Sequence, residues 1–203
     1  KGIQRDLNFM YGAYRWLLPQ SGALNPSNGT VKDSAEWTAD PQKAETSIKS
    51  LFEKWKGYEL FRIGLACETG MGFHYWGEQA RKDFQQYLKE QYKTIGDLNR
   101  HWGTSYKDFS EITLPVRKPE TPADHARWEH WRRLREKTFE KFYSDYYNIV
   151  RKLNGKIDIF GLASTGSLNS PLYGVNFYEI TKYQDINGMD GTAVDPEKEW
   201  LFQ

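Results

Sequence analysis

The residue best suited by its position to act in catalysis is a glutamate at the end of an apolar segment. Residues 60–66 read LFRIGLA, a run typical of a buried strand, and Cys67 and Glu68 follow it directly. In α/β folds the working groups gather at the carboxyl ends of parallel strands. Residues 73–76 then supply four rings, and partial desolvation beside them would raise the pKa of a carboxyl toward that of a general acid. The segment predicts a catalytic acid, and the alternative is a carboxylate that caps the next helix.

Further polar and aromatic residues are predicted at the same edge of the sheet. An arginine can hold a hydroxyl group or orient a carboxylate, and a tryptophan can form a stacking surface for a ligand ring. Polar side chains that follow the later strands would add hydrogen bonds to a polyhydroxylated ligand. We therefore predict substrate contacts from Arg15, Trp16, His74, Trp76, Ser164 and Asp190. For the tryptophans core packing is the competing interpretation, and for Ser164 it is ordinary loop chemistry.

Metal and cofactor sites are not predicted. His125 and His130 are five residues apart, which places them about 140° apart on an ideal helix, so they do not share a ligand. The single cysteine, Cys67, excludes an intrachain disulfide and a multi-cysteine zinc site. No glycine-rich segment has the spacing of a phosphate-binding loop. Any catalysis is therefore expected to use side chains alone.

The elements that would position these residues alternate between short apolar runs and longer amphipathic ones. This alternation is typical of a parallel sheet covered by helices. Asp40 before Pro41 predicts a helix start, and the long loop before it is rich in turn-forming residues. We predict strands at 10–18, 60–66, 157–163 and 186–190, and helices at 41–57, 78–92, 95–102, 128–153 and 177–183, with a loop at 20–40 and turn-like chain at 103–124.

The predicted fold class is α/β, and the four strand and helix units amount to about half of an eightfold barrel, which needs around 250 residues. The chain, 1–203, contains no clear linker, so we expect one domain that is incomplete as a barrel. An open α/β sheet of four strands fits the length as well.

The composition of the chain argues against some classes of function and favours others. The formal charge of +1 disfavours a nucleic-acid partner, and no run reaches the roughly 18 apolar residues of a membrane span. The aromatic content of 16% exceeds ordinary packing needs and suggests a flat ligand or a sugar. The chain starts at Lys1 without a signal-peptide pattern, so we expect a removed leader or an excerpt, with compartment and oligomeric state left open.

The run from Phe84 to Pro115 carries a resemblance to a known family, and it reads FQQYLKEQYKTIGDLNRHWGTSYKDFSEITLP. This run, together with Glu68 before it, resembles the glycoside hydrolase family 42 β-galactosidases, retaining enzymes of clan A. The resemblance implies a (β/α)8 TIM barrel of which the chain covers about strands three to six. It also implies retaining cleavage of a β-linked glycoside, with Glu68 as general acid/base after strand four, no cofactor and a glycoside as substrate.

Two departures from the family pattern qualify this expectation. Cys67 stands where the family has an asparagine that holds the 2-hydroxyl of the sugar. The nucleophile of the family follows strand seven, and neither Glu197 nor Glu199 follows an apolar run that would mark such a strand. The alternative is a non-catalytic carbohydrate-binding or scaffold domain derived from the same barrel. A hydrolase built on another open sheet would require a nucleophile elbow or a metal cluster, and the sequence shows neither.

Overall fold

The structure is a computed structural model that describes residues 5–8, 17, 22–25, 28–32, 39–57, 60–64, 75–164 and 176–190. Its strands are β1 (Arg5–Asn8), β2 (Ala23–Asn25), β3 (Thr30–Lys32), β4 (Leu60–Gly64), β5 (Asp158–Ser164) and β6 (Ile186–Asp190). Its helices are α2 (Pro41–Lys54), α3 (Glu78–Tyr92), α4 (Ile95–Trp102), α5 (Pro122–Leu153) and α6 (Phe177–Ile180), with short 3-10 turns η1 (Phe109–Glu111) and η3 (Thr181–Tyr183).

Four of the strands form one parallel sheet in the order β1-β4-β5-β6, so that each strand lies beside the next parallel strand of the chain. This sequential order is typical of barrels, whereas doubly wound open sheets reverse their order at a switch point. Gly64 at the end of β4 pairs in register with Phe160 of β5, and Phe160 pairs in register with Ile186 of β6. The strands β5 and β6 therefore continue four residues beyond that level, to the paired residues Ser164 and Asp190.

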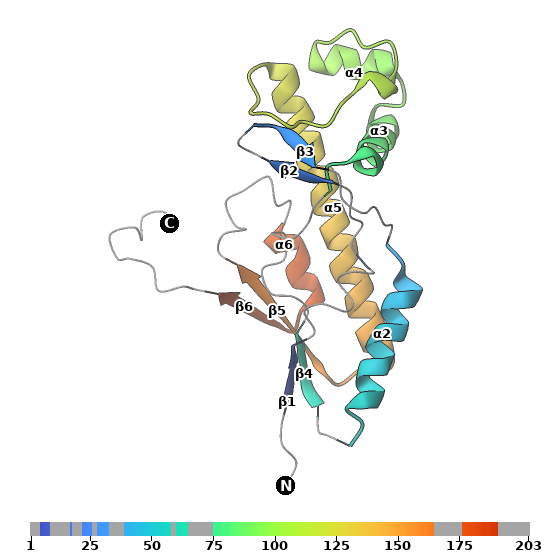
Figure 1. The fold of residues 1–203 in the computed structure, drawn as a ribbon, viewed down its shortest axis with the longest axis vertical. Coiled ribbons are helices and arrows are strands. Elements are labelled where there is room, and N and C mark those ends of the chain that lie inside the picture. The colour runs from blue at the N-terminus through green and yellow to red at the C-terminus, as the bar shows by residue number, and fades with distance from the viewer. Residues whose placement is uncertain are drawn as a thin grey trace, which may run out of the picture.

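The long helix α5 connects the sheet to a helical region beyond its carboxyl edge. Tyr146 of α5 donates a hydrogen bond from its hydroxyl to the Gly64 carbonyl at 3.3 Å, which fixes the helix against the end of β4. At 1.5 Å per residue, the part of α5 that precedes Tyr146 extends about 36 Å past this point. Figure 1 shows α3 and α4 around this amino-terminal part, with the β2–β3 hairpin between it and the sheet.

Local signals explain why most helices begin and end where they do. Asp40 accepts a hydrogen bond from Lys43 N and caps α2, with Pro41 in the first turn. Thr121 and Asp124 form a reciprocal capping box at the start of α5. Gly103 closes α4 in the left-handed conformation, with φ of 69°. Asn154 ends α5 in an extended conformation instead.

The predicted helices at 41–57, 78–92 and 95–102 are confirmed, as are the strands β4, β5 and β6 and the long helix, which starts earlier, at Pro122. Of the strand predicted at 10–18 only Leu17 is described, and this residue is helical and buried; residues 10–16 and 18 lie outside the described residues. The strand Arg5–Asn8 was not predicted. The predicted loop 20–40 contains the β2–β3 hairpin. Its turn uses Gly29 at φ of 70°, a conformation that glycine adopts without strain.

Candidate active site

The structure describes only some of the predicted site residues. Glu68 and Cys67, together with Arg15, Trp16 and His74, lie outside the described residues. Of Ser164 and Asp190 the backbone is described, and it places them side by side as the last residues of β5 and β6. Both therefore lie at the carboxyl edge of the sheet, as predicted. Their contact with a substrate stays a prediction.

Trp76 is the predicted binding residue whose side chain is described, and it is 6% exposed. Its ring lies 5.2 Å from the Trp131 ring and meets the Trp128 ring edge-on at 6.0 Å. Tyr75 stacks on Trp131 at 6.0 Å, and Phe84 packs edge-on against it at 5.5 Å. We call Tyr75, Trp76, Phe84, Trp128 and Trp131 the aromatic cluster. Packing is the observed role of Trp76 here, and a role in substrate binding remains a prediction.

Arg135 is a buried residue that the sequence interpretation missed. It stands in the charged stretch RWEHWRRLREK, yet Arg135 is 1% exposed. Its guanidinium lies 5.2 Å from the Trp76 ring centre and 5.8 Å from that of Trp131, which is a cation–π arrangement. A signal was present, since Arg135 stands four residues from both Trp131 and Phe139 on the apolar stripe of α5.

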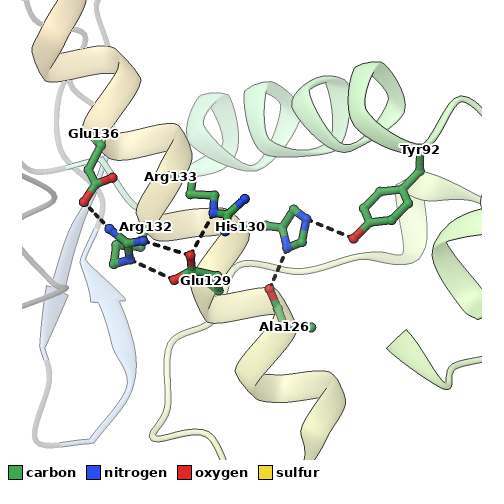
Figure 2. A network of polar contacts seen from close by, with 7 residues as sticks. All are labelled: Tyr92, Ala126, Glu129, His130, Arg132, Arg133 and Glu136. Carbon is green, nitrogen blue, oxygen red and sulfur yellow. Dashed lines mark hydrogen bonds and ion pairs between the residues drawn. The ribbon is translucent and has the colours of Figure 1, made fainter. Parts of the chain in front are cut away.

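The charged side chains on the neighbouring face of α5 form a network of ion pairs (Figure 2). Arg132 donates from Nε and Nη2 to the two carboxylate oxygens of Glu129, each at 2.8 Å, and Arg133 Nε donates to Oε1 at 2.7 Å. The hydrogen bonds from Arg132, followed by those from Arg133, lower the pKa of Glu129 to about 2. Arg132 also pairs with Glu136. A carboxylate held ionised in this way is unsuited to act as a general acid.

His130 belongs to a separate hydrogen-bond chain, and Figure 2 draws its contacts with Tyr92 and Ala126. Trp102 Nε1 donates to the Tyr92 hydroxyl oxygen at 2.9 Å, and this hydroxyl lies 2.9 Å from His130 Nε2. His130 Nδ1 lies 2.8 Å from the Ala126 carbonyl, which can only accept, so Nδ1 carries the proton. Nε2 is then the acceptor for the Tyr92 hydroxyl. Burial lowers the pKa of His130, which favours the neutral imidazole of this arrangement.

We expect this arrangement to make the stability of the protein depend on pH. The pKa of His130 is lowered below the 6.5 of an exposed histidine, so the unfolded chain takes up a proton first as the pH falls. Stability should be fully present above about pH 6.5 and should decrease below it. Urea unfolding of the wild type and of His130→Gln across this range would measure the slope that His130 contributes.

The matched control is His125→Gln, because His125 is exposed and lies five residues earlier on α5. This variant should keep the pH slope of the wild type, whereas His130→Gln should flatten it. Equal slopes in all three proteins would contradict the assignment.

A cavity of about 230 Å³ lies at the start of α5, far from the sheet. Trp128 and Arg127 line it together with Thr113, Val116, Arg117 and Glu120. The Trp128 indole donates to the Arg117 carbonyl at 2.6 Å, which fixes its ring. Trp128 precedes Tyr146 by a helical rise of about 27 Å, so this cavity is separate from the carboxyl edge.

Within the described ranges no three or more His, Cys, Asp or Glu side chains come together as metal ligands would. None of the described helices is both long and apolar enough to cross a membrane.

Comparison with solved structures defines the class of fold. The chain superposes on a β-galactosidase from the psychrophile Marinomonas ef1 with a TM-score of 0.64 and 16% identity, covering 88% of this chain and 28% of the other. A GH42 β-galactosidase, Gan42B from G. stearothermophilus, gives a TM-score of 0.63 at 17% identity, and the match covers 90% of this chain and 28% of the other. An agarase gives a TM-score of 0.60 over 98% of this chain. The fold is thus that of a part of the TIM-barrel glycosidases.

Sequence comparison then defines the family. Residues 42–199 match the profile of glycoside hydrolase family 42, described as beta-galactosidase, and the chain belongs to this family. Among curated proteins, the β-galactosidase BgaB of Geobacillus kaustophilus is 24% identical over 151 residues, or 68% of this chain. A β-galactosidase from a second Geobacillus strain matches to the same extent. The chain spans about a fifth of the length of these relatives, 21%.

Proposed function

We propose that the chain is the acid/base-bearing part of a retaining β-glycosidase of the β-galactosidase type. In this proposal the four parallel strands are barrel strands three to six, and residues 1–203 are one domain portion of the barrel. The sequential order β1-β4-β5-β6 supports this, because neighbouring barrel strands follow one another along the chain. Family membership supports the glycosidase chemistry.

The observation that carries the proposal is the register of the sheet. Gly64, Phe160 and Ile186 form one row across β4, β5 and β6. Four residues further along each strand direction come Glu68, Ser164 and Asp190. Four residues of chain span at most about 14 Å, and the proposal therefore assigns Glu68 to the same edge as the other two. Neighbouring strands lie about 4.8 Å apart, which would bring Ser164 within reach of a sugar held by Glu68.

The mechanism follows from the chemistry of retaining enzymes. A carboxylate attacks the anomeric carbon while Glu68 gives its proton to the departing glycosidic oxygen, and a glycosyl ester forms. Glu68, now ionised, then takes a proton from water, which attacks the same carbon and releases the sugar with its configuration retained. The two carboxyl groups of such a pair lie about 5 to 5.5 Å apart. We propose that a barrel strand outside this chain supplies the attacking carboxylate.

Arg15, Trp16, His74, Trp76, Ser164 and Asp190 remain the proposed substrate-binding residues. Of these, the pair Ser164 and Asp190 has the most support, because both end neighbouring strands at the proposed sugar site. Hydrogen bonds from such residues to hydroxyl groups can strengthen in the transition state and add to catalysis.

A non-catalytic carbohydrate-binding domain is the second candidate, and Cys67 favours it. This cysteine replaces the asparagine that holds the 2-hydroxyl of the sugar in the family, so one contact that matters in the transition state would be lost or supplied by another group. A domain of this kind would bind galactosides without turnover.

Hydrolysis of aryl β-glycosides by a protein that carries the whole barrel separates the two candidates. The proposal predicts turnover of an aryl β-galactoside, and proton NMR of the first-formed sugar should show the β-anomer. Binding without turnover would favour the second candidate. Formation of the α-anomer would exclude the retaining mechanism.

A further inference from the structure

We infer that Asn154 is a site of spontaneous deamidation, at the joint between α5 and β5. The chain contains three Asn-Gly pairs, at 28–29, 154–155 and 187–188. In this reaction the glycine backbone nitrogen attacks the side-chain carbonyl carbon of asparagine, and ammonia leaves. Water then opens the cyclic imide to aspartate or isoaspartate. Glycine favours the attack because it has no Cβ to obstruct the approach.

The side-chain oxygen of asparagine accepts hydrogen bonds in two of the pairs. Asn154 Oδ1 accepts a hydrogen bond from Lys156 N at 3.1 Å. Asn28 Oδ1 accepts from Thr30 N at 3.0 Å and from Thr30 Oγ1 at 2.8 Å. Negative charge develops on this oxygen as the nitrogen attacks, so donors already in place stabilise the intermediate. The two donors at Asn28 would favour that pair, so a faster reaction at Asn154 must come from the attacking nitrogen.

The attacking nitrogen is engaged in one pair and accessible in the other. Gly29 N donates to the Asn25 carbonyl at 2.9 Å, and a Cβ on Gly29 would lie 2.8 Å from the Val116 carbonyl oxygen. Gly29 is thus both bonded and closely packed. Gly155 is exposed, and within the described chain its N–H makes no hydrogen bond. The nearest atom to a Cβ at Gly155 would be the Arg151 carbonyl oxygen, at 3.7 Å, which leaves room for the backbone to rotate.

The third pair lies within a strand. Asn187 and Gly188 of β6 are level with Gly161 and Leu162 of β5. Closing the imide ring requires the backbone to leave its extended conformation, which would break the ladder between the two strands. This pair should react slowly as long as the sheet is intact.

Modification at Asn154 would affect the structure around it. Arg151 and Lys152 occupy the last turn of α5, and Arg151 Nη1 donates to the Ile157 carbonyl at 2.6 Å. A new carboxylate at the carboxyl end of a helix opposes the helix dipole, although these cations offset part of that effect. Isoaspartate would in addition lengthen the backbone between α5 and β5. We therefore expect the modified protein to melt at a lower temperature.

Peptide mapping of the aged protein tests the inference. The folded chain is incubated in mildly alkaline buffer, and the mass gain from exchange of NH2 for OH is followed in the three peptides. Asn154 should convert first, with Asn28 slower by at least about fivefold, the factor that corresponds to about 1 kcal/mol for one hydrogen bond. In concentrated urea the three rates should converge.

The matched variant is Gly155→Ala, which the open surroundings of Gly155 accommodate and which should slow conversion at Asn154 alone. Conversion of Asn28 or Asn187 in the folded protein as fast as that of Asn154 would overturn the inference. It would also be overturned if Asn154 converted in urea but stayed intact in the folded protein.

Discussion

Replacing Glu68 by Gln in a protein that carries the whole barrel is expected to lower kcat by about 10²- to 10⁴-fold, the usual contribution of a general acid/base. Glutamine has nearly the same shape as glutamate but cannot donate a proton to the leaving oxygen. The affinity for substrate should change little, because ground-state binding does not require proton transfer. Steady-state kinetics on an aryl β-galactoside with a poor leaving group would measure both quantities.

The matched control is Glu53→Gln, which neutralises an exposed carboxylate on α2 that pairs with Lys56. This variant should retain wild-type kcat and KM. The loss of kcat/KM in Glu68→Gln should also shrink with a better leaving group, because such a group departs without protonation and kcat/KM does not include hydrolysis of the glycosyl ester. A uniform loss of kcat/KM across leaving groups, or turnover at the wild-type rate, would remove Glu68 from the proposed role.

Truncation of Trp131 to Ala should cost about 3 to 5 kcal/mol of unfolding free energy, as for other large aromatic residues in cores. Trp131 is fully buried and contacts the rings of Tyr75, Trp76 and Phe84. It therefore connects α5 to α3 and to the segment that precedes α3. Chemical denaturation monitored by circular dichroism would measure the loss.

Tyr178→Ala serves as the control, since Tyr178 is 79% exposed and its loss should change stability by less than about 0.5 kcal/mol. If Trp131→Ala unfolded at the same denaturant concentration as the control, the aromatic cluster would not be a structural centre of the helical region.

Much of the fold is predictable from local signals. Asp40 before Pro41 marks the start of α2, and the apolar runs at β4, β5 and β6 are bounded by polar or turn residues. These elements were predicted because their cause lies within a few residues of sequence. The first strand was not, because Arg5–Asn8 has three charged or polar residues among four and derives its strand conformation from pairing with β4.

The site is less accessible to sequence reasoning, because burial depends on residues distant in the chain. Arg135 resembles a surface residue in a charged segment, and only packing against Trp76 and Trp131 shows that it is buried. Trp76 was predicted as a stacking surface, and the structure shows it packed in the aromatic cluster. Ser164 and Asp190 pair in register at the ends of β5 and β6. The sequence implied this pairing only through the predicted parallel arrangement of the strands.

Azide rescue of Glu68→Ala is the most direct test of the proposed role of Glu68. In a retaining enzyme that lacks its acid/base, azide enters the space of the missing carboxylate and attacks the glycosyl ester from the face that water would use. With an activated aryl β-galactoside, the proposal predicts that azide restores turnover and that NMR identifies the product as a β-galactosyl azide. An α-galactosyl azide would identify Glu68 as the nucleophile, and no rescue would contradict a catalytic role for this residue.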